Sequence, residues 1–156
     1  MNSTANKRLK DDTRRPFWRR KSLAEMTPVE WESLCDGCAR CCLEKLEDPQ
    51  TGEVGYTNVG CALLDIDTCR CTDYAARARA MPDCLRLSAL NIATISWLPS
   101  SCAYLLLAQG RDLADWHPLV SGEADSVHAA GMSVKGRAVA AADAGDLEDH
   151  IVTWPE

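Results

Sequence analysis

Residues 35–42 read Cys-Asp-Gly-Cys-Ala-Arg-Cys-Cys, so four of the nine cysteines in this 156-residue chain fall within eight positions. The other five follow at positions 61, 69, 71, 84 and 102. Thiolates are strong, soft ligands for zinc and iron, and a Cys-x2-Cys loop directs two sulfurs at one ion. Gly37 lies inside the first such loop, where a backbone free to take positive φ helps the chain to turn tightly. The stretch predicts a cysteine-ligated metal site around which the domain is organised.

The spacing of the cysteines leaves two kinds of metal site open. Eight cysteines would fill two tetrahedral zinc sites. Cys35-x2-Cys38-x2-Cys41 also matches the first three ligands of a bacterial ferredoxin, but the next cysteine follows at once, so a remote cysteine would have to complete an iron–sulfur cluster. The candidate cofactors are therefore zinc or iron, the latter alone or in a cluster. The thiol ligands predicted from the spacing are Cys35, Cys38, Cys41, Cys42, Cys61, Cys69, Cys71 and Cys84.

The adjacent pair Cys41-Cys42 bears on how the ligands are divided. Neighbouring side chains in extended backbone point in opposite directions. We therefore expect these two sulfurs to serve different ions or to bridge a cluster.

The polar N-terminus lacks the apolar core of a signal peptide, and no stretch approaches the ~18 apolar residues of a membrane span. We expect a cytoplasmic protein with reduced thiols and no membrane association. The odd number of cysteines also disfavours a disulfide framework.

Charge is divided unevenly along the chain, whose net charge is −6. Residues 1–22 carry eight Lys or Arg and two Asp, whereas the remainder carries nine basic and 21 acidic residues. An acidic body argues against a general nucleic-acid surface. Any contact with phosphates is expected only from the basic arm, which is otherwise a solvated segment lying against the acidic body.

The domain organisation follows from this pattern. Residues 1–16 are predicted to be a disordered basic arm, 17–137 a cysteine-cluster metal-binding domain, and 138–156 an acidic tail with an edge strand at 151–154. The predicted fold is α+β: a small metal-stapled domain with short helices, a β-hairpin and many irregular loops. A thin hydrophobic core is commonly supported by a metal, because metal binding contributes directly to folding.

Local signals place several elements. Thr27, Pro28 and Glu30 form a capping box that begins a helix leading to Cys35, and Phe17-Trp18 are expected to dock the arm onto the body. Further elements are a hairpin of 43–47 and 53–59, a helix over 74–81, a loosely helical 85–98, a helix over 102–109 capped by Ser100 or Ser101 and ended by Gly110, and a helical turn from 125 to 130.

Other side chains are weaker candidates for the site. His117 and His128 are extra ligands or proton carriers in one interpretation and packed residues in the other, and His150 has no assigned role. Asp36 either marks a turn or accepts hydrogen bonds behind the ligands. Cys102 opens an apolar helix and is expected to be a buried thiol. No nucleophile–base spacing or phosphate-binding loop emerges, so the sequence assigns no enzymatic activity.

The chain resembles the bacterial proteins with a Cys-x2-Cys-x2-Cys-Cys motif that are described as zinc- or iron-chelating, and among them the YcgN-like cysteine-cluster proteins. The resemblance spans about 17–154 and rests on Phe17-Trp18, Trp31 to Cys38, Cys41-Cys42, Lys45 to Asp48, Thr57-Asn58-Val59, Cys61, Thr68 to Cys71, Asp73-Tyr74, Pro82-Asp83-Cys84, Trp97-Leu98-Pro99, Cys102-Ala103-Tyr104, Asp115 to Gly122 and Ser126-Val127-His128. It implies a metal site that also includes Cys102 and His117, and it implies no specific biochemical role.

Four hypotheses follow. The leading one is binding of zinc or an iron–sulfur cluster by the clustered thiolates, which as a purely structural site would suit a module that binds a protein partner. The alternative is a redox or metal-dependent enzyme, or an accessory to one, with Cys102 or His117 near the metal. Metal storage or delivery is third, and nucleic-acid binding through the arm is fourth.

Overall fold

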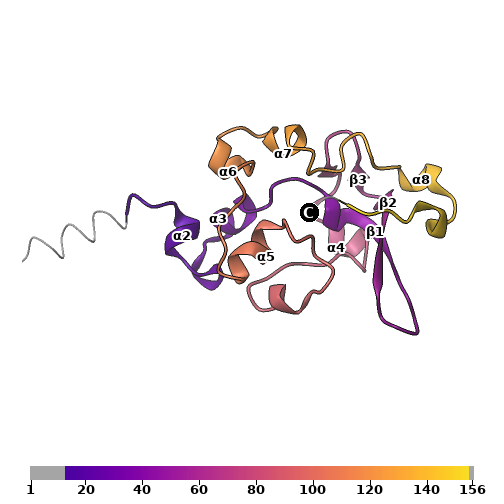
Figure 1. Ribbon diagram of the computed structural model, residues 1–156, viewed down its shortest axis with the longest axis horizontal. Coiled ribbons are helices and arrows are strands. Elements are labelled where there is room, and N and C mark those ends of the chain that lie inside the picture. Colours follow the sequence, from indigo (N-terminus) through magenta and orange to yellow (C-terminus); the bar gives the residue numbers. More distant parts are fainter. Residues whose placement is uncertain (1–12, 155–156) are drawn as a thin grey trace, which may run out of the picture.

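Short helices and two small antiparallel sheets, joined by irregular loops, make up an α+β fold (Figure 1). The computed structural model describes residues 13–154. The helices are α2 (Phe17–Arg20), α3 (Pro28–Ser33), α4 (Arg77–Ala80), α5 (Ala103–Ala108), α6 (Pro118–Ser121), α7 (Ser126–Ala129) and α8 (Ala141–Ala144). The 3₁₀ segments within residues 13–154 are η1 (Leu23–Glu25), η2 (Arg40–Cys42), η3 (Ile92–Thr94) and η4 (Leu147–His150). Most of residues 1–16, the predicted arm, lies outside the described residues.

The predicted hairpin is confirmed. Strand β1 (Leu43–Glu47) pairs antiparallel with β2 (Val54–Gly60), and Lys45 lies opposite Tyr56. The Asp48 carboxylate accepts the backbone N–H of Gln50 at 2.7 Å, which closes the connecting turn. A second pair is formed by β3 (Leu64–Asp65) and β4 (Arg70–Cys71), with Cys71 in β4 and Cys69 in the connection between the strands. Both sheets therefore begin or end at a cysteine-containing segment.

Helix α3 begins as predicted. The Thr27 hydroxyl accepts the N–H of Glu30 at 3.2 Å, and the Glu30 carboxylate accepts the N–H of Thr27 at 2.9 Å. Helix α5 is also confirmed and ends before Gly110, whose φ of +71° reverses the chain. Its N-cap residue is Cys102, so the assignment of the cap to Ser100 or Ser101 is wrong.

Three predicted elements are shorter than expected. The helix over 74–81 reduces to α4, because Arg77 folds back to donate to the Tyr74 carbonyl and stack on its ring. In 85–98 only η3 is helical, since the Asn91 amide bonds the backbone of Arg86 and Ser88 and holds a loop. The edge strand at 151–154 is a single bridge between Ile151 and Thr57. The turn over 125–130 is confirmed as α7.

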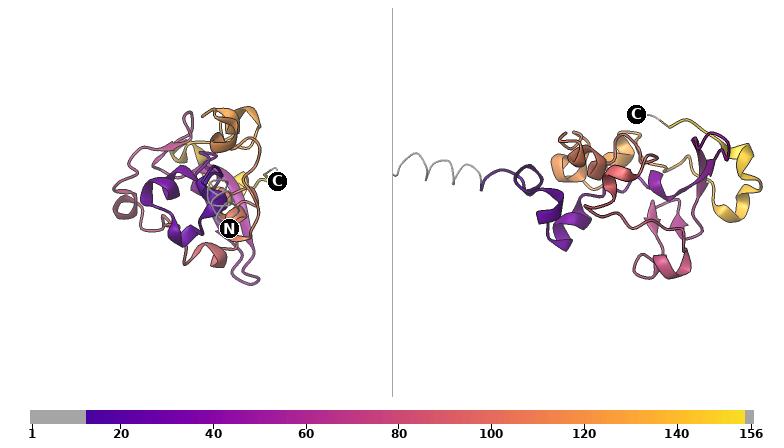
Figure 2. Two further views of the ribbon diagram at one scale, coloured as in Figure 1. Left: turned by 90° about the vertical axis from the view of Figure 1, so that its left-hand side faces the viewer. Right: turned by 90° about the horizontal axis from the view of Figure 1, so that it is seen from below.

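Two hydrophobic clusters form the core. The first cluster contains Leu34, Ile92, Leu98, Ala103, Tyr104 and Leu113, with Phe17 and Trp18 packed against it as predicted. The second cluster contains Ala39, Leu43, Cys69, Val134 and Trp154. Helix α2 and the β1–β2 hairpin lie at opposite ends of the molecule (Figures 1 and 2). The motif at 35–42 runs between the two clusters, since Leu34 belongs to the first and Ala39 to the second.

Candidate metal centre

The motif loop is fixed at both of its ends. Leu34 is fully buried in the first cluster, and Leu43 is 3% exposed in the second. Between them Gly37 and Ala39 take positive φ of 79° and 60°, which turns the chain twice within five residues. The N–H of Val134 donates to the Cys38 carbonyl at 3.0 Å. Rigid packing on either side therefore positions the cysteines of the loop.

Four thiols at or beside this loop affect one another's ionisation, and we call them the first thiol group: Cys35, Cys38, Cys41 and Cys102. The last comes from the start of α5, far along the chain. Removal from water, and then the nearby Cys41, raises the pKa of the Cys102 thiol to about 11, with the N–H of Leu105 opposing the effect. Cys35 keeps an exposed edge, yet the protein around its sulfur, together with Cys41, raises its pKa to about 12.

Backbone N–H groups face three of these sulfurs. The N–H groups of Gly37 and Arg40 face Cys35 and Cys38, each two residues downstream of its cysteine, and those of Tyr104 and Leu105 face Cys102. Each such donor favours the ionised thiolate, which is the form that binds metal. The loop and the helix start thus prepare their sulfurs for a cation.

Cys41 and Cys42 lie in a tight turn and not in the extended backbone from which their division between ions was argued, and their service to different ions or to a cluster stays a prediction. They lie in η2, a 3₁₀ segment rather than extended backbone, and the Cys42 thiol faces the Cys41 sulfur. This contact lowers the pKa of Cys41, with help from the Lys45 ammonium, and the same contact together with burial raises the pKa of Cys42. The tight turn brings the two sulfurs together.

Lys45 places a fixed cation over the motif. Its ammonium donates to the carbonyls of Cys41 at 3.1 Å and Leu43 at 2.7 Å, and it lies 4.3 Å from the centre of the Trp97 ring. Trp97 is held in turn by Tyr56, whose hydroxyl donates to its carbonyl. Sequence reasoning missed Lys45, although its place on a strand directly after the cysteines was visible.

Four further thiols affect one another or Cys41, and we call them the second thiol group: Cys42, Cys61, Cys71 and Cys84. The N–H of Cys61 donates to the Cys42 carbonyl at 2.8 Å, and the Cys61 sulfur accepts the N–H of Leu63 at 3.5 Å. Burial raises the pKa of Cys84, and Cys61 and Cys71 add to that rise. The adjacent residues Cys41 and Cys42 link the two groups.

Cys69 stands apart from both groups. It is 4% exposed, has a φ of +57° and packs in the second cluster. Its sulfur faces the hydroxyl of Ser133 and the backbone N–H of Lys135, and Ser133 is bonded to His128 Nδ1 at 2.7 Å. Burial raises the pKa of its thiol, and none of the causes of that shift is another cysteine.

His117 uses both ring nitrogens on the backbone. Nε2 lies 2.8 Å from the Leu34 carbonyl, and Nδ1 accepts the N–H of Leu119 at 3.0 Å. The residue is 1% exposed and begins α6. As placed, the ring joins α6 to the segment before the motif. Its assignment as a metal ligand stays a prediction.

Two buried charges flank the first thiol group. Asp36 is 7% exposed, and its Oδ2 atom has no hydrogen-bond partner. Arg40 is 3% exposed, with one bond from its guanidinium to Ser101 at 3.3 Å and an unpartnered Nε. Among the described residues, no Lys, Arg or His lies within ion-pair distance of Asp36. An unpaired buried carboxylate beside thiols is an environment that favours a cation.

These residues therefore suit a metal by the chemistry of their donor atoms. Within residues 13–154, no three Cys, His, Asp or Glu side chains converge closely enough to hold one metal ion as they stand. The soft donors, the N–H groups facing the sulfurs and the orphaned carboxylate oxygen nevertheless suit a zinc or iron centre. The residues that would hold it are those of the first thiol group.

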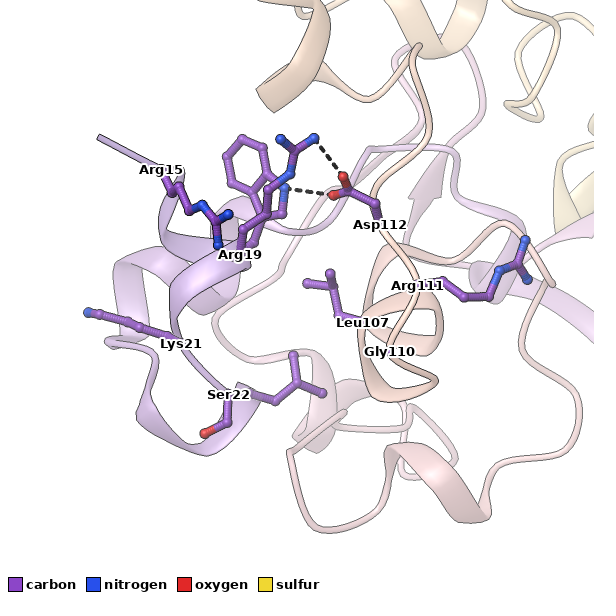
Figure 3. Close-up of a pocket in the computed structure, with 10 residues that line it drawn as sticks. Arg15, Arg19, Lys21, Ser22, Leu107, Gly110, Arg111 and Asp112 are labelled. Carbon is purple, nitrogen blue, oxygen red and sulfur yellow. Dashed lines mark hydrogen bonds and ion pairs between the residues drawn. The ribbon is translucent and has the colours of Figure 1, made fainter. Parts of the chain in front are cut away.

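A separate surface pocket of about 460 Å³ lies between α2 and the end of α5 (Figure 3). Arg15, Arg19, Lys21 and Arg111 line it, but Lys21 and Arg111 extend in opposite directions. Asp112 pairs with Arg19 at 2.6 Å and accepts the Trp18 indole N–H at 3.1 Å. The cations do not converge, so the pocket adds no anion site to the cysteine centre.

The part of the chain that the structure describes contains no helix long and apolar enough to cross a membrane. No solved structure matches the chain significantly.

Comparison with known proteins gives the family. Residues 34–103 match the CxxCxxCC family model, described as "Putative zinc- or iron-chelating domain". The UPF0260 protein of Gluconacetobacter diazotrophicus is 61% identical over 140 residues, covering 90% of this chain and 88% of the relative. The UPF0260 protein of Parvibaculum lavamentivorans is 58% identical over 146 residues, covering 92% and 95%. With relatives this similar over nearly their whole length, the chain belongs to the UPF0260 family.

Proposed function

We propose that this protein binds iron as an iron–sulfur cluster, or else zinc, through the first thiol group. The observation that carries the proposal is the position of Cys102. The start of α5 brings this thiol to the Cys35-x2-Cys38-x2-Cys41 loop, as a fourth, remote ligand would require. The chelating domain of the family supports the same chemistry.

An iron–sulfur cluster suits the arrangement better than a single zinc ion. Zinc holds its sulfurs at ~2.3 Å, which requires four thiolates to converge on one point. A cluster spreads its thiolates, because each binds a different iron atom. The four thiols influence one another's pKa without converging on one ion, which favours the wider spacing.

The surrounding residues compensate the charge of such a centre. Lys45 and Arg40 contribute positive charge, and the N–H groups of Gly37 and Arg40 face the sulfurs of Cys35 and Cys38. When bound, an iron–sulfur cluster supplies an electron-transfer couple, whereas zinc supplies a fixed cross-link between the two hydrophobic clusters.

A redox role is the second candidate function. A redox role requires Cys102 or His117 near the metal, and the placement of Cys102 in the first thiol group favours this role. A reversible one-electron reduction of the bound centre, followed by electron paramagnetic resonance, is its test. A centre that neither accepts nor releases an electron would exclude this role.

Metal and sulfide analysis, together with an absorption spectrum of protein purified without oxygen, tests the main proposal. Iron, acid-labile sulfide and a broad band near 400 nm, typical of sulfur-to-iron charge transfer, are the expected result. Stoichiometric zinc with no visible band would replace the cluster by a zinc site. Neither metal in stoichiometric amount would overturn the proposal.

A further inference from the structure

His117 is a buried histidine that contacts the backbone directly before the motif. The residue is 1% exposed, and Nε2 lies 2.8 Å from the carbonyl oxygen of Leu34, which is itself fully buried. Leu34 is the C-cap residue of α3, and the carbonyls of the last turn of a helix need partners from outside the helix. Because a buried carbonyl without a hydrogen bond is costly, the His117 ring satisfies a group that the helix itself does not.

The two hydrogen bonds of the ring assign its protonation. A carbonyl oxygen only accepts, so the proton of the bond to Leu34 belongs to Nε2. Nδ1 accepts the backbone N–H of Leu119 at 3.0 Å and therefore carries no proton. The ring is a neutral imidazole protonated on Nε2, and a metal would have to displace one of these two bonds in order to bind it.

The position of Leu34 gives the bond its consequence for the motif. Leu34 directly precedes Cys35, the first cysteine of the motif, and Leu119 lies in the first turn of α6, whose N-cap residue is His117. One ring thus joins α6 to the peptide from which the chain enters the motif. Without the Nε2 bond that peptide is free to rotate, and the direction of the Cys35 side chain changes with it.

A second side chain holds the same end of α3. The Tyr104 hydroxyl donates to the carbonyl of Trp31 at 2.7 Å, and the two rings lie 4.6 Å apart between their centroids. Tyr104 is in α5, two residues after Cys102, and Trp31 is four residues before Cys35. Helices α5 and α6 are therefore both tied to the last turn of α3, so the segment that carries Cys102 is fixed relative to the segment that carries Cys35.

We propose that His117 is a positioning residue of the motif and not a metal ligand: its neutral ring holds the carbonyl of Leu34 and so sets the direction of Cys35. As far as metal binding is concerned, this inference rests on the proposed function, which makes Cys35 a ligand. The hydrogen bonds themselves require no metal. The nitrogen that matters for the motif is therefore Nε2, whereas Nδ1 serves only the start of α6.

The test compares His117→Gln with His117→Asn in the full-length protein. The amide nitrogen of Gln takes the place of Nε2 and donates to Leu34, whereas the amide oxygen of Asn takes the place of Nδ1 and keeps the N-cap of α6. Neither amide is among the side chains that ordinarily bind zinc. The pair therefore separates the two hydrogen bonds from each other, and both of them from ligation.

Two quantities are measured for each variant. The first is the alkylation rate of Cys35 in the reduced, metal-free protein, followed by mass spectrometry, and the second is the affinity for zinc, from competition with a chelator. We expect His117→Gln to keep both wild-type values. His117→Asn should change the Cys35 rate and lower the zinc affinity by at least about tenfold.

The other outcomes are distinguishable. Loss of zinc affinity in both variants, with unchanged Cys35 rates, would make His117 a ligand and overturn the proposal. Wild-type values in both variants, or loss confined to His117→Gln, would show that the Leu34 bond does not set Cys35. Failure of the wild type to bind zinc or iron stoichiometrically would overturn the proposed function, while the Cys35 rates would still test His117.

Nitrogen-15 NMR of the wild-type His117 ring decides the matter if His117→Asn does not fold. The expected result is a proton on Nε2 alone, both in the metal-free protein and after addition of zinc. A ring nitrogen bound to zinc, or a ring that carries its proton on Nδ1, would contradict the proposal.

Discussion

Cys38 and Cys69 are both buried cysteines that face backbone N–H groups, yet their surroundings differ. Cys38 is 8% exposed and lies among the other thiols of its group and beside Asp36. Cys69 is 4% exposed and lies against Ser133 and Lys135 in the second hydrophobic cluster. The two cysteines thus share burial and backbone N–H groups at their sulfurs, whereas only Cys38 lies near other thiols. The difference shows that a cysteine within a dense motif becomes a candidate ligand only where the fold brings further donors to it.

Replacing each of these cysteines by serine should give the largest difference in metal content between two variants. Cys38→Ser should lose most of the bound metal, because a hydroxyl is a poor ligand for zinc or iron at neutral pH. Cys69→Ser should keep the wild-type metal content, although a polar group in the core lowers its stability. Metal analysis of both purified variants is the measurement. Equal metal loss in the two would contradict the separation of Cys69 from the thiol groups.

The pH dependence of metal binding should be steep. Burial raises the pKa of Cys102 to about 11, so at pH 7 this thiol is protonated in the metal-free protein and must release its proton to bind. Affinity should therefore rise with pH by about tenfold per unit for each thiol released. Competition titrations with a chelator between pH 6 and 8 measure the slope. A pH-independent affinity would exclude protonated thiols as ligands.

The stability of the metal-free protein should change in the opposite sense. Between pH 9 and about 11, the Cys102 thiol of the folded protein keeps a proton that the same thiol in the unfolded chain, with its ordinary pKa of 9, has already lost. The contribution of Cys102 to the free energy of unfolding is therefore complete below pH 9 and is lost as the pH rises through about 11. Urea unfolding of the reduced, metal-free protein measures it. Cys102→Ala should flatten the decline, and an unchanged decline would contradict the assignment to Cys102.

Lys45 and Lys135 allow a test, with a smaller expected effect, of the contrast between the surroundings of Cys38 and those of Cys69. Lys45 lies over the motif, and Lys135 lies near Cys69. Lys45→Met keeps an apolar chain over Trp97 and removes the charge, so metal affinity should fall by roughly tenfold, whereas Lys135→Met should leave it unchanged. Isothermal titration of the two variants measures this. Equal affinities would show that the Lys45 charge does not act on the centre.

Thr27→Ala should have the smallest effect on the metal centre, because it removes the N-cap hydrogen bond of α3 and not a metal ligand. Loss of the hydroxyl that accepts the Glu30 N–H should cost about 1 kcal/mol of unfolding free energy. Metal stoichiometry should stay at the wild-type value. Denaturant unfolding and metal analysis measure the two quantities, and metal loss on this substitution would mean that the centre depends on α3 more closely than its geometry indicates.

Sequence reasoning succeeded where a local signal determines a local structure. The capping box at Thr27, the turn at Asp48 and the stop at Gly110 all have their causes within a few residues, and all three are present. The α+β fold with a hairpin and irregular loops was also predictable from these signals. The candidate metal and its donor class followed from the cysteine spacing, in agreement with the matching family model.

Sequence reasoning did not reach the features that tertiary contacts decide. The separation of Cys69 depends on Ser133 and Lys135, and the grouping of Cys102 depends on how α5 packs against the motif. The orphaned oxygen of Asp36 depends on burial, which an aspartate after a cysteine does not reveal. The backbone at Cys41 and Cys42 is 3₁₀ and not extended, which the adjacency of two cysteines does not reveal.

The central claim is that Cys102 shares a metal centre with the motif cysteines, and cysteine-resolved alkylation with and without metal tests it most directly. Mass spectrometry would follow each thiol in the folded, reduced protein before and after metal is removed by a chelator. The account predicts that metal protects Cys102 as strongly as Cys35, Cys38 and Cys41, and that the reactivity of Cys69 does not change. A Cys102 that reacts at the same rate in both states would contradict the account.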